Sequence, residues 1–192
     1  MKFRLKETPF LILLLVVSCV KLNPEEVNNS TTINSDGLVL IGNEGNFQYG
    51  NATLSSFNKT TGETNYNIYQ ELNDSQLGDV LHSISHIDHD FYLVINNSGK
   101  IIIVDDQSLL YKNEINQLNS PRKIIKVNSG KFYITDLYGS KLYVYNSYDE
   151  SLGEIKVTGH CEDLLKHNGE AFVCNVENNQ IYVIDINSNS LV

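Results

Sequence analysis

Residues 132–146 read Phe132-Tyr133-Ile134-Thr135-Asp136-Leu137-Tyr138-Gly139-Ser140-Lys141-Leu142-Tyr143-Val144-Tyr145-Asn146, two β-rich runs separated by a polar turn. The same pattern occurs at residues 91–105 and 172–185, and a diverged copy of the second run lies at residues 52–58. The Asn or Asp that closes the second run recurs at spacings of 47, 41 and 39 residues; these closing residues are Asn58, Asp105, Asn146 and Asp185. The chain is therefore an array of about four similar units.

Repeats of this length that consist of short strands predict a β-propeller, in which each unit is one four-stranded antiparallel blade. Tyrosine and β-branched residues fall inside the runs, whereas Gly, Asn, Asp and Ser fall in the turns, and no segment has a convincing helical pattern. We name the strands of each blade a, b, c and d, and expect all four in every unit except the fourth, which keeps almost no strand d. The sequence thus predicts an all-β chain with the blades in residues 37–192.

The number of units bears on whether the blades can close into a ring. Propellers close rings of about four to eight blades, and closure protects their strand edges. We find about four units and no C-terminal segment that returns to complete the first blade. We therefore expect an open partial ring, whose terminal blades expose apolar faces and favour oligomerisation or aggregation.

The N-terminus predicts export. A basic start, with Lys2, Arg4 and Lys6, precedes the apolar run 10–17, which is too short to cross a bilayer as a helix and is typical of a signal peptide. The residues Val16-Val17-Ser18-Cys19 resemble the bacterial lipobox, whose cysteine receives the lipid.

The lipobox predicts a lipoprotein signal peptide over residues 1–19 and attachment to the membrane through lipid on Cys19 only. An ordinary cleaved signal peptide with an incidental cysteine is the alternative. Residues 20–36 are rich in Asn, Ser and Thr and have little apolar periodicity, so we expect a flexible tether.

The charge of the chain argues against nucleic acid as a partner. The net charge is −9, with 14 Lys and Arg against 23 Asp and Glu, and a nucleic-acid surface needs clustered Lys and Arg. Cys161 and Cys174 lie on the expected first and second strands of one blade. In an exported protein they are either bridged or present as two free thiols.

Ligands of propellers usually bind at the rim formed by the b–c and d–a connections. Here that rim gathers aromatic residues for stacking, together with amides and one arginine that can orient a polar ligand. The expected ligand-binding residues are Asn46, Phe47, Tyr49, Asn97, Arg122, Asp136, Tyr138 and Glu162. Each single Asn has an alternative explanation, because turns favour residues that tolerate left-handed backbone.

Catalytic and metal motifs are weak. His82 and His86 share a strand face, but His89 belongs to a turn, so we expect solvated polar residues and no metal site. The sequence has no nucleophile elbow, no His-Glu-x-x-His and no phosphate loop. His160 with Glu162 is the one rim pair comparable to those of axial lyases or lactonases. We expect a protein that is not an enzyme and has no cofactor.

Residues 171–185 resemble the YVTN-type propeller repeat, an aromatic-Val-Thr-Asn strand followed by a polar turn and Val-x-Val-Ile-Asp. Over residues 40–185, the segments Gly42-Asn43-Glu44-Gly45-Asn46-Phe47, Ser120-Pro121-Arg122 and Thr135-Asp136-Leu137-Tyr138 resemble YncE-like surface lipoproteins of gut-type bacteria. That group includes the cobamide-binding BtuG type, which sits on an outer-membrane vitamin B12 transporter. Relatives in the group have more blades than this chain.

The resemblance implies a binding propeller, lipid-anchored at the outer membrane or cell surface, that captures a small-molecule ligand. A corrinoid (cobamide, vitamin B12) is the candidate ligand, and a TonB-dependent-type outer-membrane transporter is the implied partner. Two alternatives stay open. One is a non-catalytic scaffold or lid for a surface receptor, and the other is an axial lyase or lactonase.

Overall fold

The computed structural model describes residues 37–192. The expected signal peptide, the lipobox Cys19 and the tether all lie outside the described residues. Within the described range, no helix is long and apolar enough to cross a membrane.

The described chain forms four antiparallel sheets, each built from strands that follow one another in sequence. The first contains β1 (Leu38–Asn43), β2 (Thr53–Asn58) and β3 (Thr64–Asn65). The second contains β4 (Leu81–Ile87), β5 (Asp90–Ile95), β6 (Lys100–Asp105) and β7 (Tyr111–Ile115). The third contains β8 (Pro121–Asn128), β9 (Lys131–Asp136), β10 (Lys141–Asn146) and β11 (Ser151–Lys156). The fourth contains β12 (Cys161–His167), β13 (Glu170–Asn175), β14 (Gln180–Asp185) and β15 (Ser190–Leu191).

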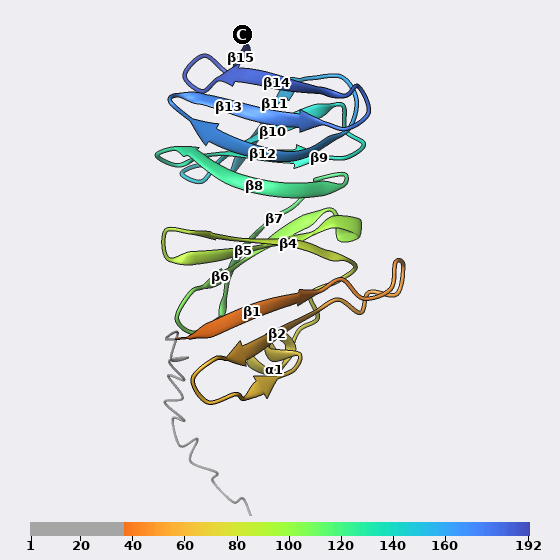
Figure 1. The fold of residues 1–192 in the computed structure, drawn as a ribbon, viewed down its shortest axis with the longest axis vertical. Coiled ribbons are helices and arrows are strands. Elements are labelled where there is room, and N and C mark those ends of the chain that lie inside the picture. Colours follow the sequence, from red (N-terminus) through yellow and green to blue (C-terminus); the bar gives the residue numbers. More distant parts are fainter. Residues whose placement is uncertain (1–36) are drawn as a thin grey trace, which may run out of the picture. The chain divides into compact units, whose positions relative to one another are not determined.

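These sheets are the blades of a partial β-propeller, as the repeat predicted. Their first strands follow one another, because β1 contacts β4, β4 contacts β8, and β8 contacts β12 (Figure 1). The third strand of each complete blade ends at its closing Asx, and so does β2 of the first blade. The side chain explains this end point: Asp185, for example, accepts hydrogen bonds from the backbone N–H groups of Asn187 and Ser188, which turns the chain.

The first blade differs from the expectation of four strands. Its sheet has three, which correspond to strands b, c and d, and within residues 37–192 no strand pairs with the other edge of β1. The fourth blade is as expected, because its outer strand β15 has only two residues.

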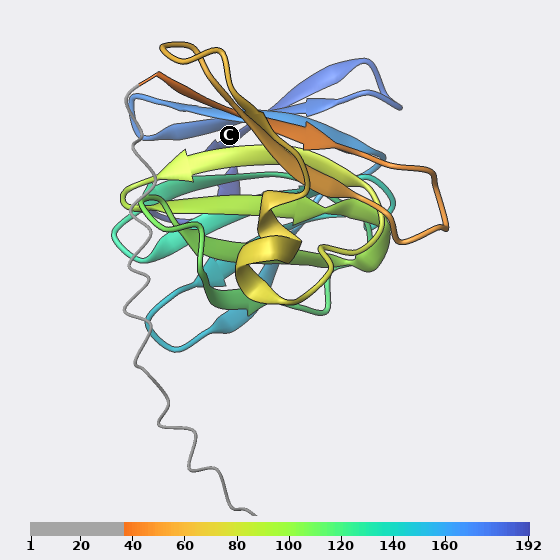
Figure 2. The same ribbon diagram turned by 90° about the horizontal axis from the view of Figure 1, so that it is seen from below.

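The expectation that the chain has no helix is wrong. Helix α1 (Ile68–Asn73) follows the first blade and packs on β2 (Figure 2), and a single 3-10 turn, η1 (Asn96–Ser98), lies between β5 and β6. Helix α1 has six residues, too few for a periodic pattern, and such a short helix is stabilised mainly by packing. Ile68 and Tyr69 supply that packing, because both are buried.

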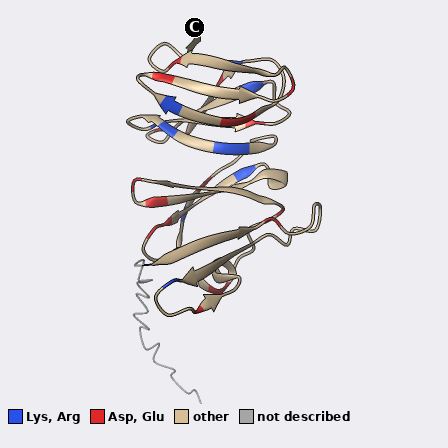
Figure 3. Cartoon of the chain, viewed as in Figure 1, with Lys and Arg blue, Asp and Glu red and all other residues tan. Residues whose placement is uncertain are grey.

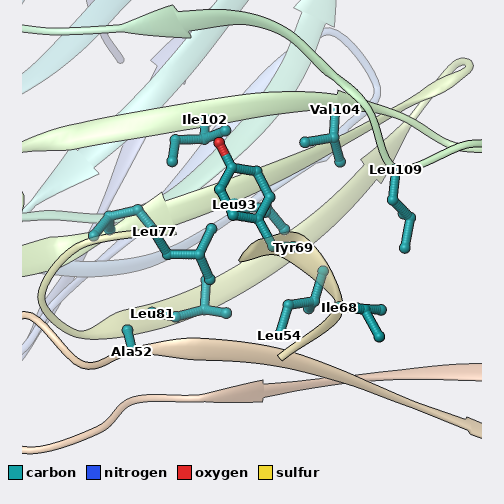
Figure 4. Packing of buried hydrophobic residues seen from close by; sticks show 11 residues of the cluster. Ala52, Leu54, Ile68, Tyr69, Leu77, Leu81, Leu93, Ile102, Val104 and Leu109 are labelled. Atoms are coloured by element: carbon teal, nitrogen blue, oxygen red, sulfur yellow. The ribbon is translucent and has the colours of Figure 1, made fainter. Parts of the chain in front are cut away.

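Each pair of neighbouring blades encloses its own apolar cluster. Between the first and second blades, Tyr69 extends from α1 toward Ile102 and packs with Leu54 and Leu93 (Figure 4). The second cluster lies between the second and third blades, and the third between the third and fourth. This is the nearest-neighbour packing of a repeat protein, in which a blade is stable only where its faces are covered.

Cys161 and Cys174, the cysteines within residues 37–192, are both free, which is one of the two alternatives that the sequence left open. Cys161 is opposite Asn175 in the register of β12 and β13, so the adjacent Cys174 points to the other face of the sheet. Cys161 is buried between blades, and burial raises the pKa of its thiol to about 11. Cys174 is exposed.

Candidate functional site

A pocket of about 600 Å³ lies at the rim where the b–c connections of the first three blades meet. The first blade contributes residues of the loop after β1, the second contributes the start of β4 and the turn η1, and the third contributes the residues around the start of β8 and the end of β9. The lining residues are Glu44, Gly45, Phe47, Val80, His82, Asn96, Asn97, Asn119, Ser120, Arg122, Leu137 and Tyr138.

The loop between β1 and β2 carries Phe47 to the pocket and is closed by its own hydrogen bonds. The side chain of Asn51 accepts from the backbone N–H of Asn46 at 2.8 Å. Gly45 has φ +74°, and a Cβ there would lie 2.4 Å from Asn51 Oδ1. Only glycine fits this turn without strain, so the sequence of the loop fixes the position of the aromatic ring.

The first strand of each four-stranded blade contains a β-bulge near its start. The register between β4 and β5 shifts between Leu81 and Ser83, and equivalent shifts occur at the starts of β8 and β12. The bulge regions contain His82, Arg122 and Glu162, which are 40 residues apart in sequence. Because a bulge re-aims side chains, it explains why these three groups meet although they belong to different blades.

Hydroxyl groups of one blade fasten the bulge of the next. Ser83 Oγ of the second blade donates to the carbonyl of Arg122 at 2.6 Å. Thr135 Oγ1 of the third blade donates to the carbonyl of Glu162 at 3.0 Å. The backbone that carries the charged side chains is therefore held across both blade boundaries.

The charged groups of the site form a chain. Arg122 Nε donates to Glu162 Oε1 at 2.8 Å and to Oε2 at 3.0 Å, and Nη2 also donates to Oε1. His82 lies between two carboxylates, with Nε2 3.5 Å from Glu162 and Nδ1 3.5 Å from Glu44. Glu44 is exposed, whereas Arg122 and Glu162 are both partly buried.

Burial lowers the pKa of His82, and the neighbouring Arg122 guanidinium lowers it further, against the opposing effect of Glu162 and Glu44. The imidazole is therefore neutral at neutral pH. Its contacts with the two carboxylates are those of a neutral ring and do not form ion pairs. Arg122 is the cation of this cluster, and Glu162 compensates its charge.

Two buried aspartates position the rim. Asp79 Oδ2 accepts from the backbone N–H of Gln48 at 2.7 Å and from Asn97 Nδ2 at 2.5 Å, which ties the first-blade loop to the second blade. Asp136 is fully buried and accepts from the backbone N–H groups of Ser120 at 2.6 Å and of Asn119 and Tyr138 at 3.1 Å.

The eight residues expected to bind a ligand thus have different places. Phe47, Asn97, Arg122 and Tyr138 line one pocket, as the rim interpretation requires. Asn46 and Tyr49 lie on the same loop as Phe47 but outside the pocket lining, and Tyr49 is 77% exposed. Glu162 faces Arg122.

Asp136 was expected to contact a ligand, but its position in the structure does not fit that role. Its carboxylate has no exposed surface, because backbone N–H groups surround it. It shapes the loop that carries Tyr138. Arg122 and Glu162 were expected on d–a loops, but both belong to strands, since β8 begins at Pro121 and β12 at Cys161.

Sequence reasoning missed several residues of the site. Glu44, Asn119 and Ser120 line the pocket, and Asp79 positions its loop. His82 was considered only as a metal ligand. The signal that could have found it is the interval of 40 residues between His82, Arg122 and Glu162.

The other histidines do not join His82. His86 Nε2 lies 3.0 Å from Asp106 Oδ2, and His89 Nδ1 lies 3.9 Å from the same oxygen. Over residues 37–192, no group of three or more His, Cys, Asp or Glu side chains is arranged to hold a metal ion. His160 lies 3.8 Å from Glu177 and forms a T-shaped pair with the Tyr138 ring, whereas Glu162 pairs with Arg122.

A second pocket, of about 430 Å³, lies at the turns that contain Asp88, Ser129 and Tyr148. Its charged groups are paired with each other, since Lys126 contacts Asp88 and Lys112 contacts Asp90, each at 2.5 Å. Elsewhere, Lys and Arg residues and Asp and Glu residues are both scattered over the blades (Figure 3). The rim pocket is the larger of these two.

Four consecutive antiparallel blades with a pocket at one rim define the class of protein as a partial β-propeller. The chain belongs to the DUF5074 family, described as a domain of unknown function, whose model matches residues 36–192. No curated protein matches the chain in sequence.

Solved structures show the same fold at low identity. A quinonprotein alcohol dehydrogenase-like protein from Bacteroides thetaiotaomicron matches with TM-score 0.64 and 17% identity, over 80% of this chain and 37% of that chain. The WD40 propeller domain of Doa1 matches with TM-score 0.59 and 11% identity, over 81% and 49%. The computationally designed Ika8 protein matches with TM-score 0.61 and 10% identity, over 83% and 46%. This chain spans less than half the length of each of these structures.

Proposed function

We propose that this protein is a binding propeller, lipid-anchored at the cell surface, that captures a small ligand in the rim pocket for an outer-membrane transporter. One observation carries the proposal: Phe47, Asn97, Arg122 and Tyr138, which come from three blades, line a single pocket of about 600 Å³. Ligand pockets in proteins are typically about 300–1,000 Å³ and combine apolar walls with a few polar groups.

The lining indicates the chemistry of the ligand. Phe47 and Tyr138 are both exposed and come from the first and third blades, so they offer stacking surfaces on either side of the second blade. Asn97 and Asn119 add amide groups, and Arg122 adds donors. A ligand with a flat ring system and many amide groups fits this lining. A corrinoid, the candidate from the sequence resemblance, has these properties.

The proposed location rests on Cys19, which lies outside the described residues. Replacing Cys19 with Ser should abolish incorporation of labelled fatty acid and release the protein from the membrane fraction. A Cys19→Ser protein that stays labelled and membrane-bound would contradict the lipid anchor while leaving the pocket proposal intact.

The decisive experiment is isothermal titration of the purified full chain with cobalamin. Saturable heat with a stoichiometry near one ligand per pocket supports the proposal. Silence with cobalamin and with several other corrinoids would reject this ligand class and favour the scaffold alternative.

A specific observation favours that alternative. Tyr49 is 77% exposed on the rim loop and lies outside the pocket lining, and protein-binding surfaces are enriched in tyrosine. A photo-crosslinking amino acid at Tyr49, used in membranes of the source cell type, would identify a contacting receptor. Crosslinks to a transporter alone would agree with both functions, so the titration is the test that separates them.

The lyase or lactonase alternative has less support. Glu162, the carboxylate that this alternative would use, accepts hydrogen bonds from Arg122 at both oxygens, and His160 contacts other residues. A carboxylate in this arrangement serves binding geometry better than proton transfer.

A further inference from the structure

The pocket of about 430 Å³ lies between the second and third blades, and we call it the turn pocket. The β4–β5, β8–β9 and β10–β11 turns border it, and these turns are at the opposite ends of the strands from the b–c connections of the rim pocket. Both of its walls belong to four-stranded blades of the described chain. Its volume is within the range of about 300–1,000 Å³ that is typical of ligand sites.

Tyr148 is an exposed ring of this pocket that other groups hold in place. The side chain is 75% exposed, but its hydroxyl oxygen lies 2.7 Å from Ser129 Oγ. The ring also lies directly against Gly130, where a Cβ would come within 2.2 Å of Tyr148 Cε2. Glycine is therefore required behind the ring, and the rest of the ring surface is open. An aromatic surface that is already held in place loses little conformational entropy when a flat apolar group stacks on it.

Two buried tyrosines bring hydroxyl groups to the same pocket. Tyr92 of β5 is 6% exposed and Tyr145 of β10 is 3% exposed, and both line the pocket. Neither hydroxyl forms a hydrogen bond with a residue of the described chain, and neither oxygen is sealed from solvent. Burial raises the pKa of both side chains, so both keep their protons and can donate. Because buried hydroxyls normally have a partner, these two are suited to a polar ligand.

The charges of the turn pocket balance. Asp88 pairs with Lys126 and Asp90 pairs with Lys112, each through one carboxylate oxygen at 2.5 Å. Since both cations are already compensated, the pocket favours a neutral ligand over a phosphate or another anion. The second oxygen of each carboxylate can still accept a hydrogen bond from a ligand hydroxyl.

We propose that the turn pocket binds a neutral sugar, with one face of the sugar ring stacked on Tyr148. The carboxylates of Asp88 and Asp90 accept from the sugar hydroxyls, and the hydroxyls of Tyr92 and Tyr145 donate to the sugar. A sugar ring fits because it combines a C–H face, which packs on aromatic rings, with adjacent hydroxyls that both donate and accept. The proposal is independent of the rim pocket, since the two pockets share no lining residue.

Saturation-transfer NMR of the purified full chain is the first test. The probes are glucose, galactose, mannose, xylose and N-acetylglucosamine, with alanine as a zwitterionic comparison and lactate as an anionic one. We expect saturation of the ring protons of at least one sugar, with a dissociation constant on the order of millimolar or lower. Alanine and lactate should receive none.

Variants of Tyr148 locate the binding. Tyr148→Ala should weaken binding of that sugar by about tenfold or more, because the stacking surface is lost. Tyr148→Phe keeps the ring and should stay within about threefold of the unsubstituted protein. Tyr66→Ala is the matched control and should change nothing, because Tyr66 is 73% exposed and lies outside the pocket lining.

Tyr92→Phe separates binding from folding. It removes a hydroxyl that has no partner in the described chain, so the melting temperature should stay the same while sugar affinity falls severalfold.

Three results would overturn the proposal. If no sugar of the panel receives saturation, the turn pocket is not a sugar site. Saturation of alanine or lactate alone would assign the pocket to a charged ligand. Sugar binding that Tyr148→Ala leaves unchanged would place the sugar elsewhere on the protein.

Discussion

Arg122 donates hydrogen bonds to both carboxylate oxygens of Glu162, a residue 40 positions later and one blade away. Both side chains are partly buried, so removing one partner leaves a charge that water reaches only in part. Glu162→Gln should lower the free energy of unfolding by about 1–2 kcal/mol, the lower end for a buried charged group because of the partial exposure. Urea denaturation measures it.

A double-mutant cycle tests whether the two side chains interact. The double variant Arg122→Met/Glu162→Gln should lose clearly less free energy of unfolding than the sum of the losses in the two single variants, because residues in contact are energetically coupled. Strict additivity would mean that the two side chains contribute independently and that the bidentate contact has no energetic role.

The two rim aromatics should carry much of any corrinoid affinity. Phe47→Ala and Tyr138→Ala should each weaken cobalamin binding by on the order of 2 kcal/mol, about 30-fold, if the rings stack on the ligand. Both rings are exposed, so the variants should fold normally. Tyr148→Ala is the matched control, since Tyr148 is an exposed ring in the second pocket. Equal loss in all three variants, measured by titration, would contradict a rim site.

His82 should make stability depend on pH. In the unfolded chain an imidazole has its ordinary pKa of 6.5, and in the folded protein burial and Arg122 lower the pKa of His82. The unfolded state thus binds more protons, and stability should fall as the pH drops through 6.5 and level off below the folded-state pKa.

His82→Gln should remove this part of the acid sensitivity, and urea denaturation at a series of pH values is the measurement. His167→Gln is the control, because His167 is an exposed residue at the end of β12. If the pH profile of the His82 variant matches that of the unsubstituted protein, another group causes the acid sensitivity.

Asp136 should be more important for folding than its place near the rim suggests. Asp136→Asn replaces one carboxylate oxygen with an amide that faces backbone N–H groups, so we expect a loss of about 2–3 kcal/mol. Asp149→Asn should change stability by less than about 0.5 kcal/mol, because the turn of Asp149 is exposed. Thermal or urea unfolding compares them, and similar losses would contradict the buried role.

Tyr69 tests the role of helix α1. Tyr69→Ala should cost about 3–4 kcal/mol, since the ring fills the cluster between the first two blades. Tyr66→Ala, three residues earlier and exposed, should have little effect. A small loss at Tyr69 would mean that the helix contributes little to the first blade.

The propeller could be predicted from the sequence because its signal is local and repeated. Asn58, Asp105, Asn146 and Asp185 end their strands through hydrogen bonds that each makes within its own turn, so the residue type alone fixes the end point. Helix α1 could not be predicted from the sequence, because Ile68 and Tyr69 stabilise it by packing against other parts of the fold, and a local sequence pattern does not show such contacts.

The site could be predicted only in part for a related reason. Phe47 and Tyr138 are exposed residues on connections, and the topology alone places them at one rim. Asp136 looks the same in sequence, but its burial depends on the backbone of residues 119 and 120, which is known only after folding. The contact between Arg122 and Glu162 depends on bulges, and a shift of one residue in register has no sequence marker.

At the bulges that begin β4, β8 and β12, the backbone shape does not depend on which side chain the bulge carries. The same backbone irregularity presents an imidazole, a guanidinium and a carboxylate at one rim, and the hydroxyls of Ser83 and Thr135 hold two of the bulged strands through carbonyl oxygens, not through the variable side chains. A substitution at His82, Arg122 or Glu162 therefore changes the side chain offered at the rim while both backbone hydrogen bonds remain available. If the rim binds a ligand as proposed, its selectivity can change one blade at a time while the blades themselves stay in place.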